Sequence, residues 1–174
     1  MTDCSLRLCV RGDEDALALV GQATFLETFA GVLEGPDILA HCRAQHAPPF
    51  YAAWLARRPG FLWLAETDVG RAPIGYLGLD EPDLPVPDPT PADIELKRIY
   101  VLSRFHGGGV GPALMEQALS TAKQAGRKRL LLGVYARNER ALAFYRRHGF
   151  EQVAQRRFTV GQHAYEDTVL AYVL

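Results

Sequence analysis

The chain has 174 residues, of which 48% are hydrophobic and 22% charged, and its formal net charge is −1. This length allows one domain with a full hydrophobic core, so we expect residues 1–174 to form a single domain. A charge so near zero is not typical of proteins that bind nucleic acid or anionic membranes, and we expect neither as a partner.

The first half of the chain predicts a strand, helices and a hairpin. Residues 6–10 alternate like a strand, and Asp13 is placed to cap the helix that follows. The apolar face of this helix includes Leu17, Val20, Thr24 and Phe25. Gly35 and Pro36 open a second helical stretch to about residue 46, and residues 50–58 suggest a short one before Pro59. Two strands at 61–66 and 73–80, joined by a turn at 68–71, complete a hairpin.

The second half begins with a proline-rich stretch. Five prolines between residues 81 and 91 exclude helix and sheet, so we expect an exposed surface loop over 81–92. A strand at 94–102, a helix ended by Gly126, an apolar strand at 129–135 and a helix from Asn138 to Gly149 follow. Two more strands flank a turn at Gly161. The order β-α-α-β-β-β-α-β-α-β-β predicts an α/β fold with a mixed sheet of about seven strands flanked by helices.

Cysteine usage and hydropathy indicate the compartment. Cys4, Cys9 and Cys42 lack the paired spacing of a disulfide framework or a zinc site, so we expect no metal. The sequence shows neither an apolar stretch of signal-peptide type near residue 1 nor a run of about 18 apolar residues. We expect a cytoplasmic protein that does not span a membrane.

The stretch RFHGGGVGPALM, residues 104–115, places four glycines directly before a helix. Glycine in regular structure costs about 0.5–1 kcal/mol relative to alanine, which favours a functional reason for the bare backbone. A glycine loop between strand and helix offers free N–H groups and the positive end of the helix dipole to a phosphate. The alternative is a flexible turn, and Pro112, which suits a first helical turn, favours phosphate binding.

Two common phosphate motifs do not match this loop. A P-loop requires Gly-Lys followed by Ser or Thr, and the corresponding GVGPAL run has neither the lysine nor the hydroxyl. A dinucleotide fingerprint requires a third glycine where Pro112 stands, and it normally follows the first strand of the chain. Nucleotide hydrolysis and dinucleotide binding are therefore disfavoured.

The segment IYVLSRFHGGGVGPALM resembles the acetyl-CoA pyrophosphate motif of the GCN5-related N-acetyltransferase (GNAT) family, Q/R-x-x-G-x-G/A after a hydrophobic strand. LLLGVYARNERALAFYRRHGFEQV is similar to the next segment of that family. The positions in register are Asn138, Ala141, Phe144, Tyr145, Gly149 and Phe150. The resemblance extends from Leu6 onward and implies the GNAT fold with acetyl-CoA as co-substrate.

Several segments are similar to the spermidine/spermine N-acetyltransferase branch in particular. They are ETF in the first helix, IELKRIYV, LGVYARNERALAFY and the ending FTVGQHAYEDTVLAYVL. The resemblance implies acetyl transfer to a primary amine of a small molecule, a polyamine being the first expectation, and a homodimer. A protein N-terminus or an aminoglycoside is an alternative acceptor. A non-catalytic acyl-CoA sensor on the same fold is the alternative function.

The resemblance also implies which residues contact the coenzyme, with one departure. His106 stands where the family has Gln or Arg, and Gly108 replaces a basic residue inside the loop, so side-chain help for the phosphates is reduced. An exposed histidine without that role is the alternative for His106. The implied contacts are Ile99, Tyr100, Val101, His106, Gly107, Gly108, Gly109, Val110, Gly111, Asn138, Ala141 and Tyr145.

Acetyl transfer needs a stabilised oxyanion and a leaving thiolate. The resemblance places the thioester against residues 99–101, where the N–H of Val101 can bond the carbonyl oxygen as it gains charge. Tyr145 matches the family tyrosine that faces the coenzyme sulfur, and a hydrogen bond to the thiolate is the better description of its role than full proton donation. Alternatively, Tyr145 is a core residue packed beside Phe144.

Two glutamates are candidates on the acceptor side. Glu95 is placed where some family members keep a general base, and strict alternation puts Glu95, Lys97, Ile99 and Val101 on one face. A glutamate of ordinary pKa is too weak to deprotonate an alkylammonium alone, so this role needs a raised pKa or a water relay. The alternative is an ion pair with Lys97 or Arg98. Glu27 is a candidate to attract a cationic amine, against the alternative of a solvated helix face.

Overall fold

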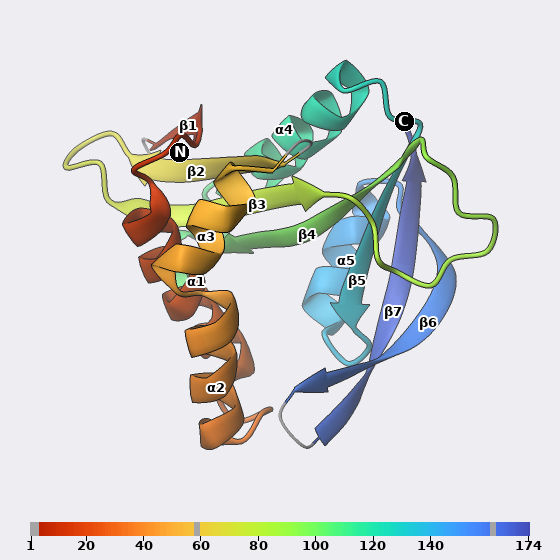
Figure 1. Cartoon of the computed structure of the whole chain (residues 1–174), viewed down its shortest axis with the longest axis horizontal. Helices are drawn as coiled ribbons and strands as arrows, with labels where there is room; N and C mark the ends of the chain where they lie inside the picture. The colour runs from red at the N-terminus through yellow and green to blue at the C-terminus, as the bar shows by residue number, and fades with distance from the viewer. Residues whose placement is uncertain (1–3, 58–59, 161–162) are drawn as a thin grey trace.

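A computed structural model describes residues 4–57, 60–160 and 163–174 (Figure 1). The elements in chain order are β1 (Cys4–Leu8), α1 (Glu14–Phe29), α2 (Gly35–Gln45), α3 (Pro48–Leu55), β2 (Phe61–Thr67), β3 (Pro73–Asp80), β4 (Asp93–Val101), a 3-10 helix η1 (Ser103–Phe105), α4 (Val110–Gln124), β5 (Arg129–Tyr135), α5 (Glu139–Arg147), β6 (Glu151–Val160) and β7 (His163–Val173). The predicted helix end at Pro59 and the predicted turn at Gly161 lie outside the described residues.

The seven strands form one mixed sheet in the order β1-β2-β3-β4-β5-β7-β6, which confirms the predicted α/β sheet. Neighbouring strands of the described chain run antiparallel except β4 and β5, which are parallel. The register between β4 and β5 covers only Asp93 to Glu95 against Arg129 to Leu131. Beyond these residues the two strands diverge, and the gap between them is visible in Figure 1.

Helices cover both faces of the sheet. One core cluster joins α4 and α5 to β2–β5, and it contains Leu114, Met115 and Leu142. A second cluster on the opposite face joins α1 and α3 to β2 and β3 through Leu17 and Trp54. Burial of one such large apolar side chain contributes about 1.5–3 kcal/mol. None of the described helices is long and apolar enough to cross a membrane.

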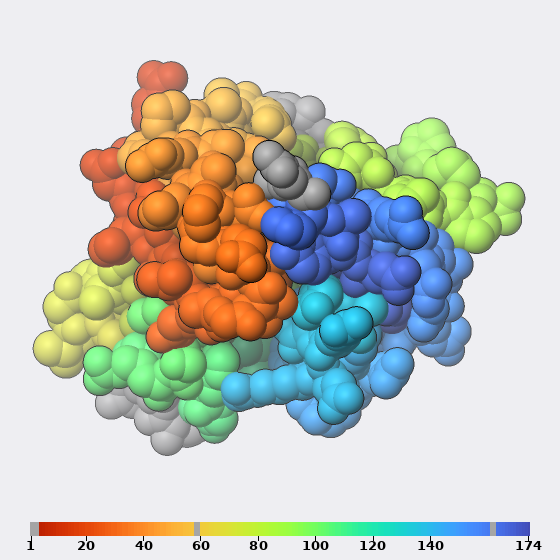
Figure 2. All heavy atoms as spheres, turned by 90° about the horizontal axis from the view of Figure 1, so that it is seen from below, coloured from red at the N-terminus to blue at the C-terminus, as the bar shows by residue number. Residues whose placement is uncertain are grey.

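A third cluster holds α1 and α2 against the β6–β7 hairpin. It is formed by Phe25, Leu33, Ile38 and Val160, with Phe158 and Tyr165 packed around it. Figure 2 shows the orange α2 region beside the blue β6–β7 end of the chain. The N-terminal helices and the C-terminal hairpin therefore meet across the gap that opens between β4 and β5.

Two local predictions need correction. Three helices separate β1 from β2, whereas the predicted order contains two; the short helix that the sequence suggests over residues 50–58 is confirmed as α3. Asp13 occupies the position before α1, but its side chain does not cap the helix. Its carboxylate instead accepts the Val10 N–H at 2.7 Å and pairs with Arg7 at 2.7 Å. A guanidinium that engages both carboxylate oxygens is a stronger partner than a helix N–H.

Strand β4 contains a bulge that the alternation pattern did not predict. Gly78 of β3 lies opposite Arg98, whereas the next residue, Leu79, lies opposite Leu96. Lys97 is therefore the extra residue on β4. A bulge of this kind shifts the side-chain alternation of the strand by one position.

The predicted common face of Glu95, Lys97, Ile99 and Val101 is therefore wrong. Ile99 and Val101 pack against the same cluster as Leu96, on the α4 face. Glu95 precedes Leu96 directly in the strand and so belongs to the opposite face. The bulge thus places Glu95 and the two hydrophobic residues on different sides of the sheet.

Candidate active site

The edge of β4 that faces the gap presents free backbone groups. Leu102 donates its N–H to Ile74 of β3 at 2.8 Å, and alternate residues of an antiparallel pair point to the same neighbour. Tyr100 therefore bonds toward β3, whereas the N–H groups of Ile99 and Val101 point toward the gap. No strand of the described chain pairs with this edge beyond Glu95.

The gap between β4 and β5 opens into a cavity of about 1070 Å³. One part of its lining comes from the glycine loop and α5, and it comprises His106, Gly107, Gly111, Asn138, Ala141, Phe144 and Tyr145. Another part comes from α1–α3, β4 and the β6–β7 hairpin, and it includes Phe29, His41, Phe50, Trp54, Arg98, Phe158 and Asp167. The middle of the lining is the β4 segment from Glu95 to Val101. Among the described residues, no group of His, Cys, Asp and Glu side chains is arranged to hold a metal ion.

The glycine loop requires glycine for its backbone conformation. Gly107 has φ 81° and Gly109 has φ 90°, a left-handed region that other residues adopt only with strain. Gly109 is the residue directly before α4. The N–H groups of Gly107, Gly109, Val110 and Gly111 take part in none of the backbone hydrogen bonds of the described chain. These donors and the positive end of α4 suit a phosphate group.

The other two predicted residues of the loop are placed differently. The N–H of Gly108 donates to Phe105 O at 3.3 Å, so Gly108 offers no free donor. His106 lines the cavity, and its Nε2 donates to Val101 O at 2.7 Å. This bond ties the loop to the free edge of β4. His106 thus has a positioning contact within the protein, and its Nε2–H is not available to a phosphate in this arrangement.

Helix α5 lines the cavity beside the glycine loop. Asn138 accepts the Ala141 N–H at 3.1 Å, which confirms the predicted helix cap. Asn138 and Ala141 both line the cavity. Arg140 and Arg147 line it too. They add positive charge near the gap.

Tyr145 lies on the inner face of α5 and is buried. Its ring packs edge-to-face against Phe144 at 5.5 Å and Phe150 at 5.9 Å. Tyr145 therefore packs in the core, as the alternative predicted, and it also lines the cavity. Its hydroxyl forms no hydrogen bond with the described residues and lines the cavity. Burial raises its pKa well above the usual value, so the hydroxyl stays protonated at neutral pH.

Glu95 is buried and already has partners. Its Oε2 accepts Lys97 Nζ at 2.7 Å and the Asp83 N–H at 2.9 Å, which confirms the ion pair considered for it. Burial nevertheless raises its pKa. Six residues separate Glu95 from Val101, which is about 20 Å at about 3.3 Å per residue. Glu95 and the Val101 N–H therefore do not contact one reacting atom.

Glu27 is not among the described residues that line the cavity. It is exposed on α1, where its carboxylate accepts the Ser103 N–H at 2.9 Å and the Ser103 hydroxyl at 3.2 Å. Both contacts hold the start of η1 against α1. The expected role in attracting the amine is therefore replaced by a positioning role.

Sequence reasoning missed two charged residues of the cavity lining, Arg98 and Asp167. Burial raises the pKa of Asp167, whose Oδ2 accepts Arg156 Nε at 3.2 Å. Burial also raises the pKa of Tyr100, and the nearby charge of Asp167 adds to this effect. Charged residues inside predicted strands were the available signal, since a strand interior rarely carries charge without a partner or a ligand.

The comparison with known families identifies the class of protein, an acyltransferase. The model of the Acetyltransferase (GNAT) family matches residues 29–150. An uncharacterized N-acetyltransferase of Mycobacterium tuberculosis is 32% identical over 158 residues, which are 91% of this chain and 96% of the relative. The chain belongs to the GNAT family and is an acetyl-CoA-dependent N-acetyltransferase.

Further relatives agree with this assignment. An uncharacterized N-acetyltransferase of Lactobacillus delbrueckii is 32% identical over 155 residues, which are 89% of this chain and 88% of the relative. The PaiA N-acetyltransferase of Thermoplasma acidophilum, solved in complex with coenzyme A, superposes with a TM-score of 0.79 at 19% identity. The superposition covers 98% of this chain and 99% of that one, which confirms the predicted fold.

Proposed function

We propose that this protein transfers the acetyl group of acetyl-CoA to a primary amine of a small molecule. The observation that carries the proposal is the gap between β4 and β5. The free N–H groups of the β4 edge and of the glycine loop border this gap, and the buried hydroxyl of Tyr145 lines the same cavity. Acetyl-CoA supplies the activated acyl group when it is bound there.

The residues of the chain divide the chemical work. The Val101 N–H, on the free edge, stabilises negative charge on the carbonyl oxygen, an interaction worth about 10²–10³ in rate in other enzymes. The Tyr145 hydroxyl donates a hydrogen bond to the sulfur as the thiolate leaves. Its raised pKa keeps it a donor without making it an acid strong enough to lose its proton.

The amine must lose a proton before or during attack. An alkylammonium of pKa about 10.4 facing a carboxyl of about 4.3 leaves about 8 kcal/mol for direct transfer, and a raised pKa of Glu95 narrows this gap. Because Glu95 lies about 20 Å along the strand from Val101, it acts through intervening water. Asp167 is a second candidate base, since it lines the same cavity and has a raised pKa.

The charged residues that line the cavity indicate which kind of amine it can accept. The resemblance to the spermidine/spermine branch favours a polyamine, which would need carboxylates free to bind several ammonium groups. The described carboxylates of the lining are instead paired with cations: Asp80 with Arg57, Asp83 with Lys97 and Arg156, Glu95 with Lys97, Asp167 with Arg156, and Glu81 with Arg127. A monoamine is therefore a better fit than a polyamine. A cytoplasmic location and a homodimer remain part of the proposal on sequence grounds.

Two measurements test the proposal. Calorimetric titration with coenzyme A should show saturable binding, and thiol release from acetyl-CoA should require an added amine. Binding without turnover on any small amine would favour the sensor. Turnover confined to peptide N-termini would replace the small-molecule acceptor by a protein. An aminoglycoside acceptor would be identified by including one in the amine panel.

A further inference from the structure

We propose that Arg98 binds a carboxylate of the acceptor, so that the substrate is a small amine that also carries a carboxylate group. This inference rests on the proposed acetyl transfer to a small amine and specifies its substrate class. It starts from the position of Arg98, which follows the β4 bulge and lines the cavity. The guanidinium is partly buried and makes contacts that leave one of its edges free.

The contacts of Arg98 use mainly one of its nitrogens. Nη1 donates to Gln45 O at 2.7 Å and to the Tyr51 hydroxyl at 2.9 Å, and it lies 3.3 Å from His46 Nδ1. Nη2 reaches only Gln45 Oε1, at 3.4 Å. Nε has no partner among the described residues. The edge formed by Nε and Nη2 is the fork that binds a carboxylate through two parallel hydrogen bonds.

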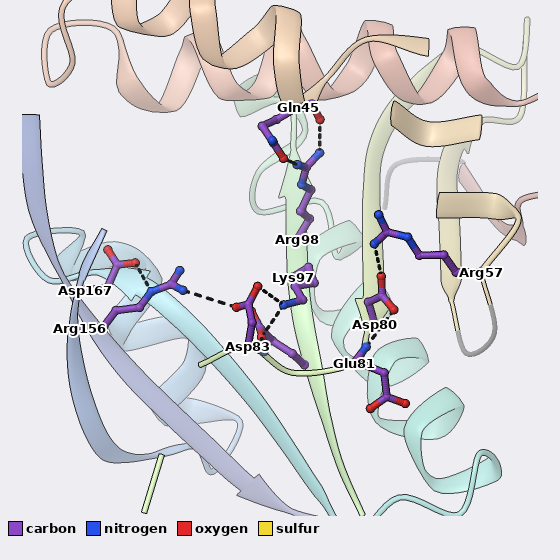
Figure 3. Close-up of polar contacts among 10 residues, drawn as sticks. Gln45, Arg57, Asp80, Glu81, Asp83, Lys97, Arg98, Arg156 and Asp167 are labelled. Atoms are coloured by element: carbon purple, nitrogen blue, oxygen red, sulfur yellow. Dashed lines mark hydrogen bonds and ion pairs between the residues drawn. The ribbon is translucent and has the colours of Figure 1, made fainter. Parts of the chain in front are cut away.

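Arg98 also differs in charge balance from two other cations of the cavity lining, Arg57 and Arg156. Arg57 pairs with Asp80 at 2.7 Å, and Arg156 lies 3.2 Å from Asp167, as Figure 3 shows. In the same view Arg98 meets only the uncharged Gln45. No carboxylate of the described residues forms an ion pair with it. A partly buried cation without an anion is costly, and an anionic ligand removes that cost.

The neighbouring histidines add no positive charge beside Arg98. Burial and the charge of Arg98 lower the pKa of His41 to about 4. Burial, Arg98 and His41 lower the pKa of His46 to about 2. Both rings are therefore neutral at neutral pH, and they neither add to nor offset the positive charge of Arg98.

Aromatic rings fix the plane of the guanidinium. Its central carbon lies 4.8 Å from the ring centre of Phe50, 5.5 Å from Trp54 and 5.6 Å from Tyr51. Such stacking holds the fork in one orientation and excludes water from one side. The indole N–H of Trp54 is a buried donor without an acceptor in the described chain, and Trp54 also lines the cavity. The aromatic rings around Arg98 therefore hold its guanidinium in place at the wall of the cavity.

A role of Arg98 in stabilising the fold explains part of these contacts. Its bond to Gln45 O ties the last turn of α2 to β4, and Nη1 makes that bond. The Nε–Nη2 edge plays no comparable part. A structural role and a substrate role thus fall on different nitrogens, and the two are separable by experiment.

The position of Arg98 also limits the size of the acceptor. Arg98 is three residues from Val101, which is about 10 Å along the strand. The spacer between the amine and the carboxylate of the acceptor should therefore be no longer than about 10 Å. Aromatic residues along the same part of the lining, among them Phe29, Phe50 and Phe158, suit an apolar spacer or side chain.

The test compares matched amines with and without a carboxylate. The pairs are γ-aminobutyrate with propylamine, ε-aminocaproate with pentylamine, and phenylalanine with phenethylamine. For at least one pair we expect wild-type kcat/KM to favour the carboxylate member by about 10- to 150-fold, which corresponds to about 1.5–3 kcal/mol for hydrogen bonds to a charged group. A preference for the uncharged member throughout would overturn the inference while leaving amine acetylation intact.

Variants of Arg98 separate recognition from folding. Arg98→Gln should abolish the preference for the carboxylate member while activity on its partner amine persists. Arg98→Lys keeps the charge but loses the fork, so part of the preference should return. Arg57→Gln is the matched control, because it removes a cavity cation that already pairs with a carboxylate, and it should keep the preference.

Three further outcomes would count against the inference. An equal loss of activity on both members in Arg98→Gln, with unchanged coenzyme A binding, would show a structural role only. If that variant does not fold, the wild-type preference alone decides. If neither member of any pair is acetylated, the acceptor class is wrong, and activity on any other amine then shows whether the proposed function itself survives.

Discussion

Replacing Tyr145 by phenylalanine tests the role of its hydroxyl with little disturbance of the core. The substitution keeps the ring between Phe144 and Phe150 and removes one oxygen. Since this hydroxyl forms no hydrogen bond within the described chain, no internal partner is left unsatisfied. We expect the free energy of unfolding to change by less than about 0.5 kcal/mol.

The catalytic effect of Tyr145→Phe should be much larger than its effect on stability. A hydrogen bond to a charged group contributes about 1.5–3 kcal/mol, so losing the one to the leaving thiolate should lower kcat by about 10- to 150-fold. The KM for acetyl-CoA should change little, because the bond strengthens only as the sulfur gains charge. Thiol release at saturating substrates, together with thermal unfolding, measures both quantities.

Two results would refute this reasoning about Tyr145. One is a variant with wild-type kcat, which would leave the residue a core tyrosine. The other is a difference in the shape of the pH profile below about pH 9. Burial raises the pKa of Tyr145, so the hydroxyl should stay protonated there, and the variant should show a lower but parallel profile.

Two more predictions concern the loop and acid stability. Gly109→Ala forces alanine into φ 90°, so it should lower the free energy of unfolding by about 1–2 kcal/mol and raise the KM for acetyl-CoA. Gly12→Ala, at φ 107° and away from the cavity lining, should cost a similar amount of stability without changing that KM. Calorimetry measures the stability of both variants, and initial rates measure the KM. Hydrogen bonds from Arg7 hold the pKa values of Asp13 and Glu66 below their usual range. The free energy of unfolding should therefore fall as the pH drops below about 5, because both carboxylates must then be protonated. Arg7→Gln should make this fall less steep, which urea titrations between pH 3 and 7 measure.

The glycine loop and the start of α5 could be predicted from the sequence because their signals are local. Glycine is required at Gly107 and Gly109 by the backbone angles of the loop itself. Asn138 caps the helix that begins one residue later, so its role is also fixed by near neighbours. The buried face of α1 and the β2–β3 hairpin follow from the same short-range rules.

The acceptor side could not be predicted in this way because it depends on contacts between distant segments. The bulge at Lys97 breaks the alternation that placed Glu95 and Val101 together, and it lies opposite Gly78 and Leu79 of another strand, β3. A Cβ at Gly78 would lie 2.6 Å from Trp54 Cη2, so only glycine lets the indole approach β3 there. No pattern within β4 carries this information.

The same bulge decides which side chains and backbone groups β4 presents to the cavity. Beyond Lys97 the side chains of Arg98 and Tyr100 face α3, whereas the side chains of Ile99 and Val101 face α4. The N–H groups of Ile99 and Val101 lie at the edge between these faces and point into the gap. Without the extra residue, Arg98 would point into the apolar core under α4, where a charge is most costly. The bulge therefore lets β4 present the cation of Arg98 to the cavity and free amides to the gap at once.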